Sequence, residues 1–399
     1  MQSISVLEGI RVLDMTEALA GPYCAMLLGD LGAEVIKIER PGSGDMSRGW
    51  APPFVGQESA YFLSVNRNKR SLTLNLKHAE AQAILHKLIQ QSDVVVVNQP
   101  SLDSLRKLKA DPDTLRDLNP RLIYCAISGY GMTGPYAGQS GYDLVAQAQS
   151  GLMAMTGEPD QGPMRYPVPL SDATAGVYSA IGILSALLVR ERTGRGQFLD
   201  VALLDGQVAW QTNLAGSYFA TGQRPKKLGN AHPNIVPYQP FKARDKYLIV
   251  AVGSERLWER FCQALEITDS IGKDPRFVTN ADRLRHRAEL IPLLEQIFCQ
   301  REAEFWLERL RAADIPSGPI NEVDEILNDP HLQARGMIVE LEHPAVGLVR
   351  SLGNPVHLGE TPVSYRLAPP MLGQHTDEVL ARLGYGAEAI EWLKSEGAI

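Results

Sequence analysis

The stretch IRVLDMTEALAGPYCAMLLGDLGAEVIKIE, residues 10–39, decides the fold class. Its pattern predicts a short apolar strand at residues 10–13, a Gly-Pro turn at residues 21–22 and a helix through Leu28. A second apolar strand follows at residues 35–38. Strand, helix and strand in this order form the unit from which parallel sheets are built.

The same alternation continues downstream. Strands are predicted at residues 71–76, 93–97 and 122–127, and an amphipathic helix at residues 78–91. The run at 93–97 is rich in valine, as is typical of a strand buried on both faces of a parallel sheet. We therefore predict an α/β fold.

The most clearly marked helix is predicted at residues 172–192. It begins at Ser171 and Asp172, a pair suited to cap a helix N-terminus, and it ends before Gly194, which commonly terminates helices. Its interior is rich in alanine and glycine, so it can lie close to another backbone. We expect this helix at the centre of the molecule.

The composition of the chain changes after residue 218, where Gly, Asn, Pro and Gln become frequent. We interpret this change as a domain boundary. A large domain is expected at residues 1–221, a smaller one at 222–328, and a further segment at 329–399. The second half is also predicted to contain a strand at 247–252 and helices at 258–265, 288–312 and 376–383.

The overall composition is that of a globular protein. The 399 residues are 44% hydrophobic and carry a net charge of −7, which argues against disorder and against sequence-independent nucleic-acid binding. No apolar run approaches the roughly 20 residues of a membrane helix, and no secretory signal is visible. The four cysteines are scattered and are expected to be buried and reduced. These features predict a cytoplasmic enzyme that has no metal site and binds neither nucleic acid nor a membrane.

Residues 129–134, GYGMTG, match the G-x-G-x-x-G fingerprint of dinucleotide-binding proteins. The following residues, PYAGQSG, add turns where the phosphate-binding helix should begin. A glycine-rich connection between a strand and a loop is therefore favoured over NAD binding.

Asp172 has two compatible interpretations. As a helix cap, it would accept hydrogen bonds from the amides of the first turn. As a nucleophile, it would be held ionised by those amides and by the helix dipole, and an ionised carboxylate can attack an acyl carbon. The residues themselves do not choose between the two.

Basic residues cluster near the ends of the predicted strands, where α/β proteins bind ligands. Each alone is expected on a solvated surface, but the cluster favours a site for a phosphate-bearing ligand. Its members are Arg40, Lys69, Arg70, Lys77, Arg106 and Lys107.

Six blocks of this sequence resemble the class III coenzyme A transferases, the family of formyl-CoA transferase and carnitine-CoA transferase. The blocks are LDMTEALAGPYCAMLLGDLGAEVIKIERPGSGD (13–45), NKRSLTLNLK (68–77), SGYGMTGPYAGQSGYDLVAQAQSG (128–151), the Asp172 helix, TGRGQFLDVALLD (193–205) and PPMLGQHTDEVL (369–380). Together they extend over nearly the whole chain.

The resemblance implies a Rossmann-like large domain built from both ends of the chain, a small α/β domain from its middle, and an interlocked, ring-like homodimer. It places the nucleophile at Asp172. Coenzyme A is implied as a substrate, not as a permanently bound cofactor. Its contacts would be Leu19, Ala20, Arg40, Leu74, Asn75, Leu76, Lys77, Asn98, Arg106, Gln139, Ser140, Gly141 and Tyr142.

The resemblance also implies a reaction that needs no ATP or metal. Asp172 would attack a donor thioester, the released thiolate would form an aspartyl-CoA thioester, and an acceptor carboxylate would reverse the exchange. Donor and acceptor are both carboxylic acids of similar energy.

Two departures from the family pattern bear on specificity. The stretch KLGNAHPNIVPYQPF (227–241) replaces a glycine-rich loop and resembles that of transferases acting on dicarboxylates. We therefore expect succinyl-CoA as the donor, a dicarboxylate such as glutarate or itaconate as the acceptor, and Gly229, Asn230 and His232 as substrate contacts. A simple turn at His232 is the alternative.

The other departure concerns Tyr142, where the related α-methylacyl-CoA racemases carry histidine. Loss of that base argues against racemisation. The racemase activity is kept as the alternative function.

Overall fold

The computed structural model describes residues 4–98 and 101–399. This part of the chain forms two compact units. The first contains the residues up to 153, 165–219 and 330–399, and the second contains 154–164 and 220–329.

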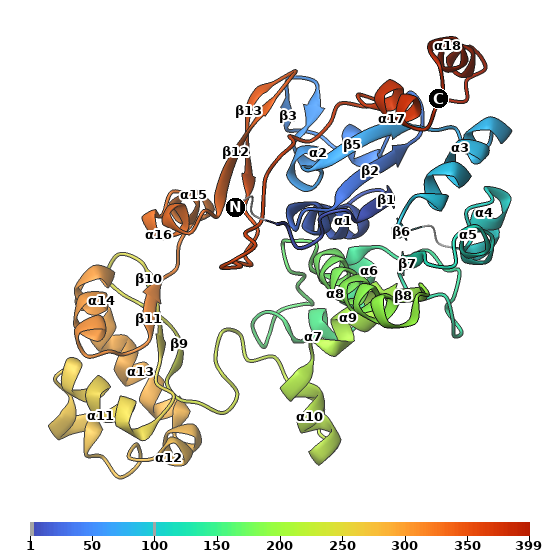
Figure 1. Ribbon diagram of the computed structural model, residues 1–399. Helices are drawn as coiled ribbons and strands as arrows, with labels where there is room; N and C mark the ends of the chain where they lie inside the picture. The colour runs from blue at the N-terminus through green and yellow to red at the C-terminus, as the bar shows by residue number, and fades with distance from the viewer. Residues whose placement is uncertain (1–3, 99–100) are drawn as a thin grey trace. The chain divides into compact units, whose positions relative to one another are not determined.

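A six-stranded parallel sheet forms the centre of the first unit (Figure 1). The order β5–β2–β1–β6–β7–β8 places β1 beside β6, where the direction of the winding reverses, as in Rossmann folds. In this register Asp14 lies beside Lys37 on one side and Val96 on the other. The strands are β1 Arg11–Met15, β2 Glu34–Glu39, β5 Lys69–Thr73, β6 Val94–Val97, β7 Ile123–Ser128 and β8 Phe198–Ala202.

The predicted α/β class and five of these strands are confirmed, but β8 was not expected. The strand predicted at 71–76 begins earlier, at Lys69, and ends at Thr73. The Leu74 amide makes the last hydrogen bond to β2, at the Glu39 carbonyl. The Asn75 amide donates instead to the Ala398 carbonyl near the C-terminus, and the strand therefore ends.

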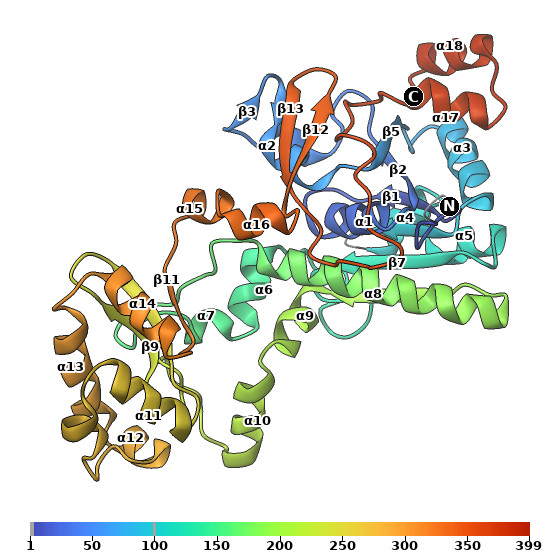
Figure 2. The same ribbon diagram turned by 60° about the vertical axis from the view of Figure 1, so that its left-hand side comes forward.

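Helices cover both faces of the sheet (Figures 1 and 2). Alternate side chains of the strands point to opposite faces, so Val12 packs beneath one helix layer and Leu13 beneath the other. One layer contains α1 Ala20–Asp30, α6 Asp143–Gln149, α8 Leu170–Thr193 and α9 Leu203–Ala209. The other contains α3 Ala79–Gln90, α4 Leu102–Lys107, α5 Pro112–Leu118, α17 Thr376–Arg382 and α18 Ala387–Ser395.

The long helix α8 packs against α1, as its small residues predicted. A Cβ atom added to Gly176 would lie 2.8 Å from the carbonyl oxygen of Ala20. The helix ends at Gly194, which has φ of 70°, as expected. Among the described helices, α8 alone is long and apolar enough to cross a membrane, but the core helix of a soluble protein meets the same criterion.

The C-terminal segment packs on the edge strand β5. The His375 amide donates to the Ser71 carbonyl at 2.9 Å, and the Thr73 amide donates to Thr376 Oγ1 at 3.1 Å. The remaining elements of the first unit are η1 Met46–Gly49, β3 Phe54–Val55, β4 Glu58–Ser59, α2 Ala60–Val65, α16 Pro330–Ala334, β12 Ile338–His343 and β13 Gly347–Leu352. Residues of both units form α7 Leu152–Met155 and α10 Thr212–Thr221.

The second unit is built on an antiparallel sheet, β11–β10–β9, with an aromatic core. The helix predicted at 288–312 is wrong as a single element, because the chain breaks after Phe298 and Trp306 folds back to donate to the Phe298 carbonyl at 2.8 Å. Cys299, at the break, is exposed and not buried as expected; the other three cysteines are buried. The elements are β9 Tyr238–Lys242, β10 Tyr247–Ala251, α11 Glu255–Ala264, η2 Thr268–Gly272, α12 Asn280–Arg285, α13 Arg287–Phe298, α14 Ala303–Ala312, β11 Ser317–Pro319 and α15 Val323–Leu327.

Candidate active site

The turn at residues 16–20 follows β1 at the point where the strand order reverses. Hydrogen bonds from other segments hold its backbone. Asn98, after β6, accepts from the Glu17 amide at 3.1 Å and donates to the Glu17 carbonyl at 2.8 Å. Ala18 adopts φ of 70°, and its amide donates to Asp45 at 3.1 Å. The chain is therefore fixed where Rossmann-like proteins bind ligands.

A cavity of about 540 Å³ opens beside this turn. Asp172, in the first turn of α8, lines it, and we call it the Asp172 cavity. The structure brings eight of the predicted CoA contacts to the same lining: Leu19, Ala20, Arg40, Asn98, Gln139, Ser140, Gly141 and Tyr142.

A second, smaller cavity of about 240 Å³ lies at the carboxyl ends of β1, β2, β5 and β6, and we call it the strand-end cavity. Glu17 and Arg40 line both cavities and form an ion pair, with distances of 2.8 and 3.0 Å from Arg40 Nη2 to the two carboxylate oxygens. The predicted residues Leu74, Asn75, Leu76 and Lys77 line the strand-end cavity.

Four predicted site residues line neither cavity. Arg106 is exposed and pairs with Asp103 at 3.0 Å, although its neighbour Leu105 lines the strand-end cavity. Gly229, Asn230 and His232 belong to the second unit, where the His232 ring stacks on Tyr238 with centroids 5.1 Å apart.

Asp172 is not a helix cap. The helix begins at Leu170, and the capping residue Pro169 makes no side-chain hydrogen bond to the first turn. Asp143 of α6 instead accepts from the Ser171 amide at 2.8 Å, so its carboxylate occupies the place that a cap would take.

The charge state of Asp172 also differs from the expectation. Burial, and then the negative charge of Asp143, raise the pKa of Asp172 to about 7. The helix N-terminus therefore does not hold this carboxyl fully ionised at neutral pH. A carboxyl with this pKa in a cavity is a recognised mark of a reactive group.

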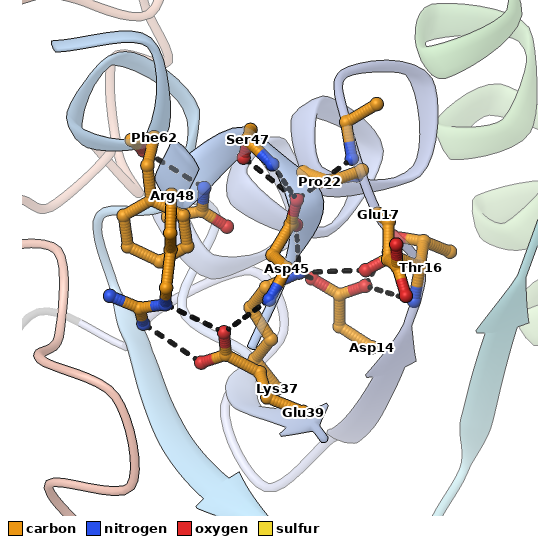
Figure 3. Close-up of polar contacts among 12 residues, drawn as sticks. Asp14, Thr16, Glu17, Pro22, Lys37, Glu39, Asp45, Ser47, Arg48 and Phe62 are labelled. Atoms are coloured by element: carbon orange, nitrogen blue, oxygen red, sulfur yellow. Dashed lines mark hydrogen bonds and ion pairs between the residues drawn. The ribbon is translucent and has the colours of Figure 1, made fainter. Parts of the chain in front are cut away.

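A buried ionic network lies beneath the 16–20 turn (Figure 3). Lys37 Nζ pairs with Asp45 at 2.8 Å, lies 3.7 Å from Asp14, and donates to the Thr16 carbonyl at 2.8 Å. Lys69 Nζ donates to Asp14, to Asn66 and to the carbonyl of Pro22 in the first turn of α1. The two lysines thus attach the turn and the start of α1 to the sheet.

The network corrects the prediction for Lys69, which was placed in the phosphate-binding cluster. Its ammonium group is fully buried. Burial lowers the pKa of Lys69 to about 8, although the negative charge of Asp14 acts to raise it. Burial would by itself raise the pKa of Asp14, but Lys37 and Lys69 lower it to about 2. Lys69 is thus committed to the scaffold.

Sequence reasoning missed several residues of the Asp172 cavity, among them Glu17, Trp50, Tyr61 and Arg165. Trp50 and Tyr61 stack edge to face with centroids 4.9 Å apart. Burial, and then the charges of nearby carboxylates with Asp172 first among them, raise the pKa of Tyr61 to about 12, so its hydroxyl stays protonated. Of these four residues only Glu17, two positions after the end of β1, carried a signal in the sequence.

Comparisons with known proteins assign the family. The sequence profile of CoA-transferase family III matches residues 7–376. The chain belongs to CoA-transferase family III.

The relatives of this CoA-transferase agree with that assignment. It is 40% identical over 400 residues to succinyl-CoA:glutarate CoA-transferase from Homo sapiens, covering 100% of this chain and 91% of that protein. It is 41% identical over 383 residues to succinate–glutarate CoA-transferase from Agrobacterium fabrum, covering 94% of this chain and 95% of that protein. The crystal structure of a CaiB/BaiF family protein from Brucella suis matches with a TM-score of 0.85 at 39% identity, covering 95% and 99% of the two chains. The racemase alternative is not favoured.

Proposed function

We propose that this CoA-transferase moves coenzyme A from succinyl-CoA to a small dicarboxylic acid such as glutarate or itaconate. The observation that carries the proposal is the position of Asp172 in one cavity with eight residues for which CoA contacts are predicted. The names of the human and Agrobacterium relatives support the dicarboxylate.

In the proposed mechanism Asp172 acts as the nucleophile. Its carboxylate attacks the thioester carbonyl, the C–S bond breaks, and the CoA thiolate leaves behind a mixed anhydride. The thiolate then attacks the Asp172 carbonyl and expels succinate, which leaves an aspartyl-CoA thioester. The acceptor carboxylate attacks that thioester, and the same two exchanges in reverse return Asp172 and release the new acyl-CoA.

The first unit is proposed to bind the CoA part of both substrates. The Asp172 cavity and the strand-end cavity have Glu17 and Arg40 in common, so a long ligand has a continuous set of contacts from Lys77 to Asp172. Arg106 is proposed as an outer contact, which requires it to leave Asp103.

The second unit is proposed to contribute to acceptor selection through Gly229, Asn230 and His232. A His232→Ala variant should raise the KM for glutarate more than the KM for pentanoate. Equal changes would favour the alternative, in which His232 shapes a turn.

The chain is further proposed to act as a homodimer in the cytoplasm, without a permanently bound cofactor. Exposed apolar side chains on α8, at Val177, Ile181 and Leu188, support burial against a second copy. The buried free thiols support a reducing compartment. Light scattering should give twice the chain mass of 43.8 kDa, and native mass spectrometry should show no retained cofactor.

The deciding experiment is incubation of the purified protein with succinyl-CoA and a panel of free acids, followed by chromatography of the CoA esters. We expect new dicarboxylyl-CoA only when the free acid is present. A racemase would instead scramble a chiral 2-methylacyl-CoA without any acid, and this outcome would contradict the proposal.

A further inference from the structure

Arg165 is a cation in the Asp172 cavity without an assigned role. It lies in the loop before α8, seven residues upstream of Asp172, and lines the same cavity. Its side chain is exposed, and within residues 4–98 and 101–399 its guanidinium group has no hydrogen-bond or ion-pair partner. A guanidinium group presents paired donors that match a carboxylate.

The other charges of the cavity are unfavourable to an anionic substrate. Three carboxyl groups line it, those of Glu17, Asp143 and Asp172. Arg40 is the only other basic residue in the described lining, and Glu17 already binds it. A dicarboxylate that presents one carboxylate to the reaction brings a second one into this surrounding, and its lost hydration needs compensation. Arg165 is the uncommitted cation that can supply it.

The loop that carries Arg165 is anchored to the same group that organises the start of α8. The fully buried Gln147 accepts from the Tyr166 amide at 3.0 Å and donates to Asp143 at 2.8 Å. Asp143 in turn accepts from the Ser171 amide at 2.8 Å. The backbone next to Arg165 and the backbone next to Asp172 are therefore held by one pair of side chains, so the distance between them is preorganised.

We propose that Arg165 binds the distal carboxylate of the dicarboxylic acid and so determines the selectivity for dicarboxylates over monocarboxylates. This inference rests on the proposed function and names the residue that carries its substrate class. It applies to the free acceptor and to the acyl group of the donor. Each has a carboxylate at the end remote from the carbon that reacts.

The test compares acceptors that differ only in the distal carboxylate. Purified wild type and Arg165→Gln are assayed with succinyl-CoA as the donor and either glutarate or pentanoate as the acceptor. Because the acceptor reacts with an enzyme-bound thioester, its kcat/KM reports the second half-reaction alone. We expect the glutarate-to-pentanoate ratio of kcat/KM to fall roughly 10- to 100-fold in Arg165→Gln, the effect of one charge-assisted hydrogen-bond pair. The kcat/KM for pentanoate should stay within about twofold, because pentanoate has no distal carboxylate and so no such hydrogen-bond pair to lose.

Two controls make the result specific. Arg192→Gln removes the same charge from the opposite end of α8 and should leave the ratio unchanged. Arg165→Glu should invert the preference toward 5-aminopentanoate, whose ammonium group replaces the distal carboxylate. Thermal melting checks that each variant is folded.

Equal losses for glutarate and pentanoate in Arg165→Gln, with an active wild type, would overturn the role of Arg165 and leave the proposed function intact. A wild type that forms no glutaryl-CoA or other dicarboxylyl-CoA would overturn both.

Discussion

The two ends of the parallel sheet each contain a buried ion cluster, but the clusters hold different parts of the molecule. At the amino end, Arg67 pairs with Asp30 at 2.6 Å and donates to the Leu352 carbonyl and to Ser351 at the end of β13. Toward the carboxyl end, Lys37 of β2 binds the 16–20 turn, and Lys69, the first residue of β5, reaches the start of α1.

The difference shows that a buried charge does not by itself mark a functional site. Asp30 and Asp45 are both buried carboxylates paired with a buried cation. Asp30 fastens the C-terminal segment to the scaffold, whereas Asp45 fastens Ala18, which lines the Asp172 cavity. What matters is which segment the hydrogen bonds hold, because the Asp172 cavity and the strand-end cavity both lie at the carboxyl end.

The largest effect that separates the two ends is expected for Asp172→Ala. This variant should lose turnover by at least about 10⁴-fold, because the nucleophile is gone, while CoA affinity stays near that of the wild type. Mass spectrometry of the wild type with succinyl-CoA should find the acyl or CoA adduct on Asp172. Near-normal turnover of Asp172→Ala would refute the mechanism.

The matched variants Asp45→Asn and Asp30→Asn test the comparison itself. Each removes one charge from a buried pair, so each should lower the free energy of unfolding by about 3 kcal/mol. Only Asp45→Asn should lower kcat/KM for succinyl-CoA, by roughly 10- to 100-fold, since a shifted turn misplaces the cavity.

Denaturant unfolding and steady-state kinetics, both at low temperature, provide the two measurements. Should Asp45→Asn not fold, Ser47→Ala removes a milder contact, the 2.7 Å hydrogen bond to Asp45. The comparison fails if turnover per folded molecule falls equally in the variants of both ends.

Arg40→Ala and Arg106→Ala refine the description of the carboxyl end. Loss of a charge-assisted hydrogen bond should weaken CoA binding by about 1.5–3 kcal/mol. We expect the larger effect for Arg40, which lines both cavities, and the smaller one for Arg106, which pairs with Asp103 outside them. Isothermal calorimetry measures both, and unchanged affinity in the two variants would remove these contacts from the proposal.

The smallest expected effects concern pH. With a pKa of about 7, Asp172 is increasingly protonated below neutral pH, so kcat/KM for the donor should rise with pH and level off above 7. A pH-independent rate between 5 and 8 would exclude Asp172 as the titrating nucleophile.

The same pKa predicts a change in stability. Because folding raises the pKa of Asp172 above its ordinary value of 3.8, ionisation destabilises the folded state progressively between about pH 4 and 7. Asp172→Asn should therefore melt at the same temperature as the wild type at pH 4 and about 2–4 °C higher at pH 8. Asp30→Asn should show no such gain, because Asp30 is paired.

Much of the fold was predictable from local patterns. The apolar runs of β1, β2, β6 and β7 mark strands because both faces of this sheet are covered by helices. The strand β8 escaped prediction because Asp200 interrupts its apolar run. That carboxylate accepts from the Met132 amide at 2.8 Å, a contact 68 residues away in sequence.

The candidate site was predictable only in part. Asp172 and, apart from Asn98, the predicted residues that line the two cavities lie in recognisable blocks of sequence. The role of Lys69 was predicted wrongly. A lysine near the end of a strand gives the same sequence pattern whether its ammonium group binds a ligand or, as here, a buried aspartate. The interpretation of Asp172 as a helix cap was wrong for a similar reason. The carboxylate of Asp143, from α6, accepts the hydrogen bond from the first turn of α8 that a cap would accept.

Local residue order was thus enough for the alternation of strands and helices and for the family blocks, because these depend on neighbours within a few residues. Tertiary structure alone decided that Asp172 titrates near pH 7, that Lys37 and Lys69 hold the 16–20 turn, and that Arg165 faces the same cavity as Asp172. Burial and Coulomb interactions depend on distances between groups that are far apart in the chain, and only the folded arrangement sets those distances.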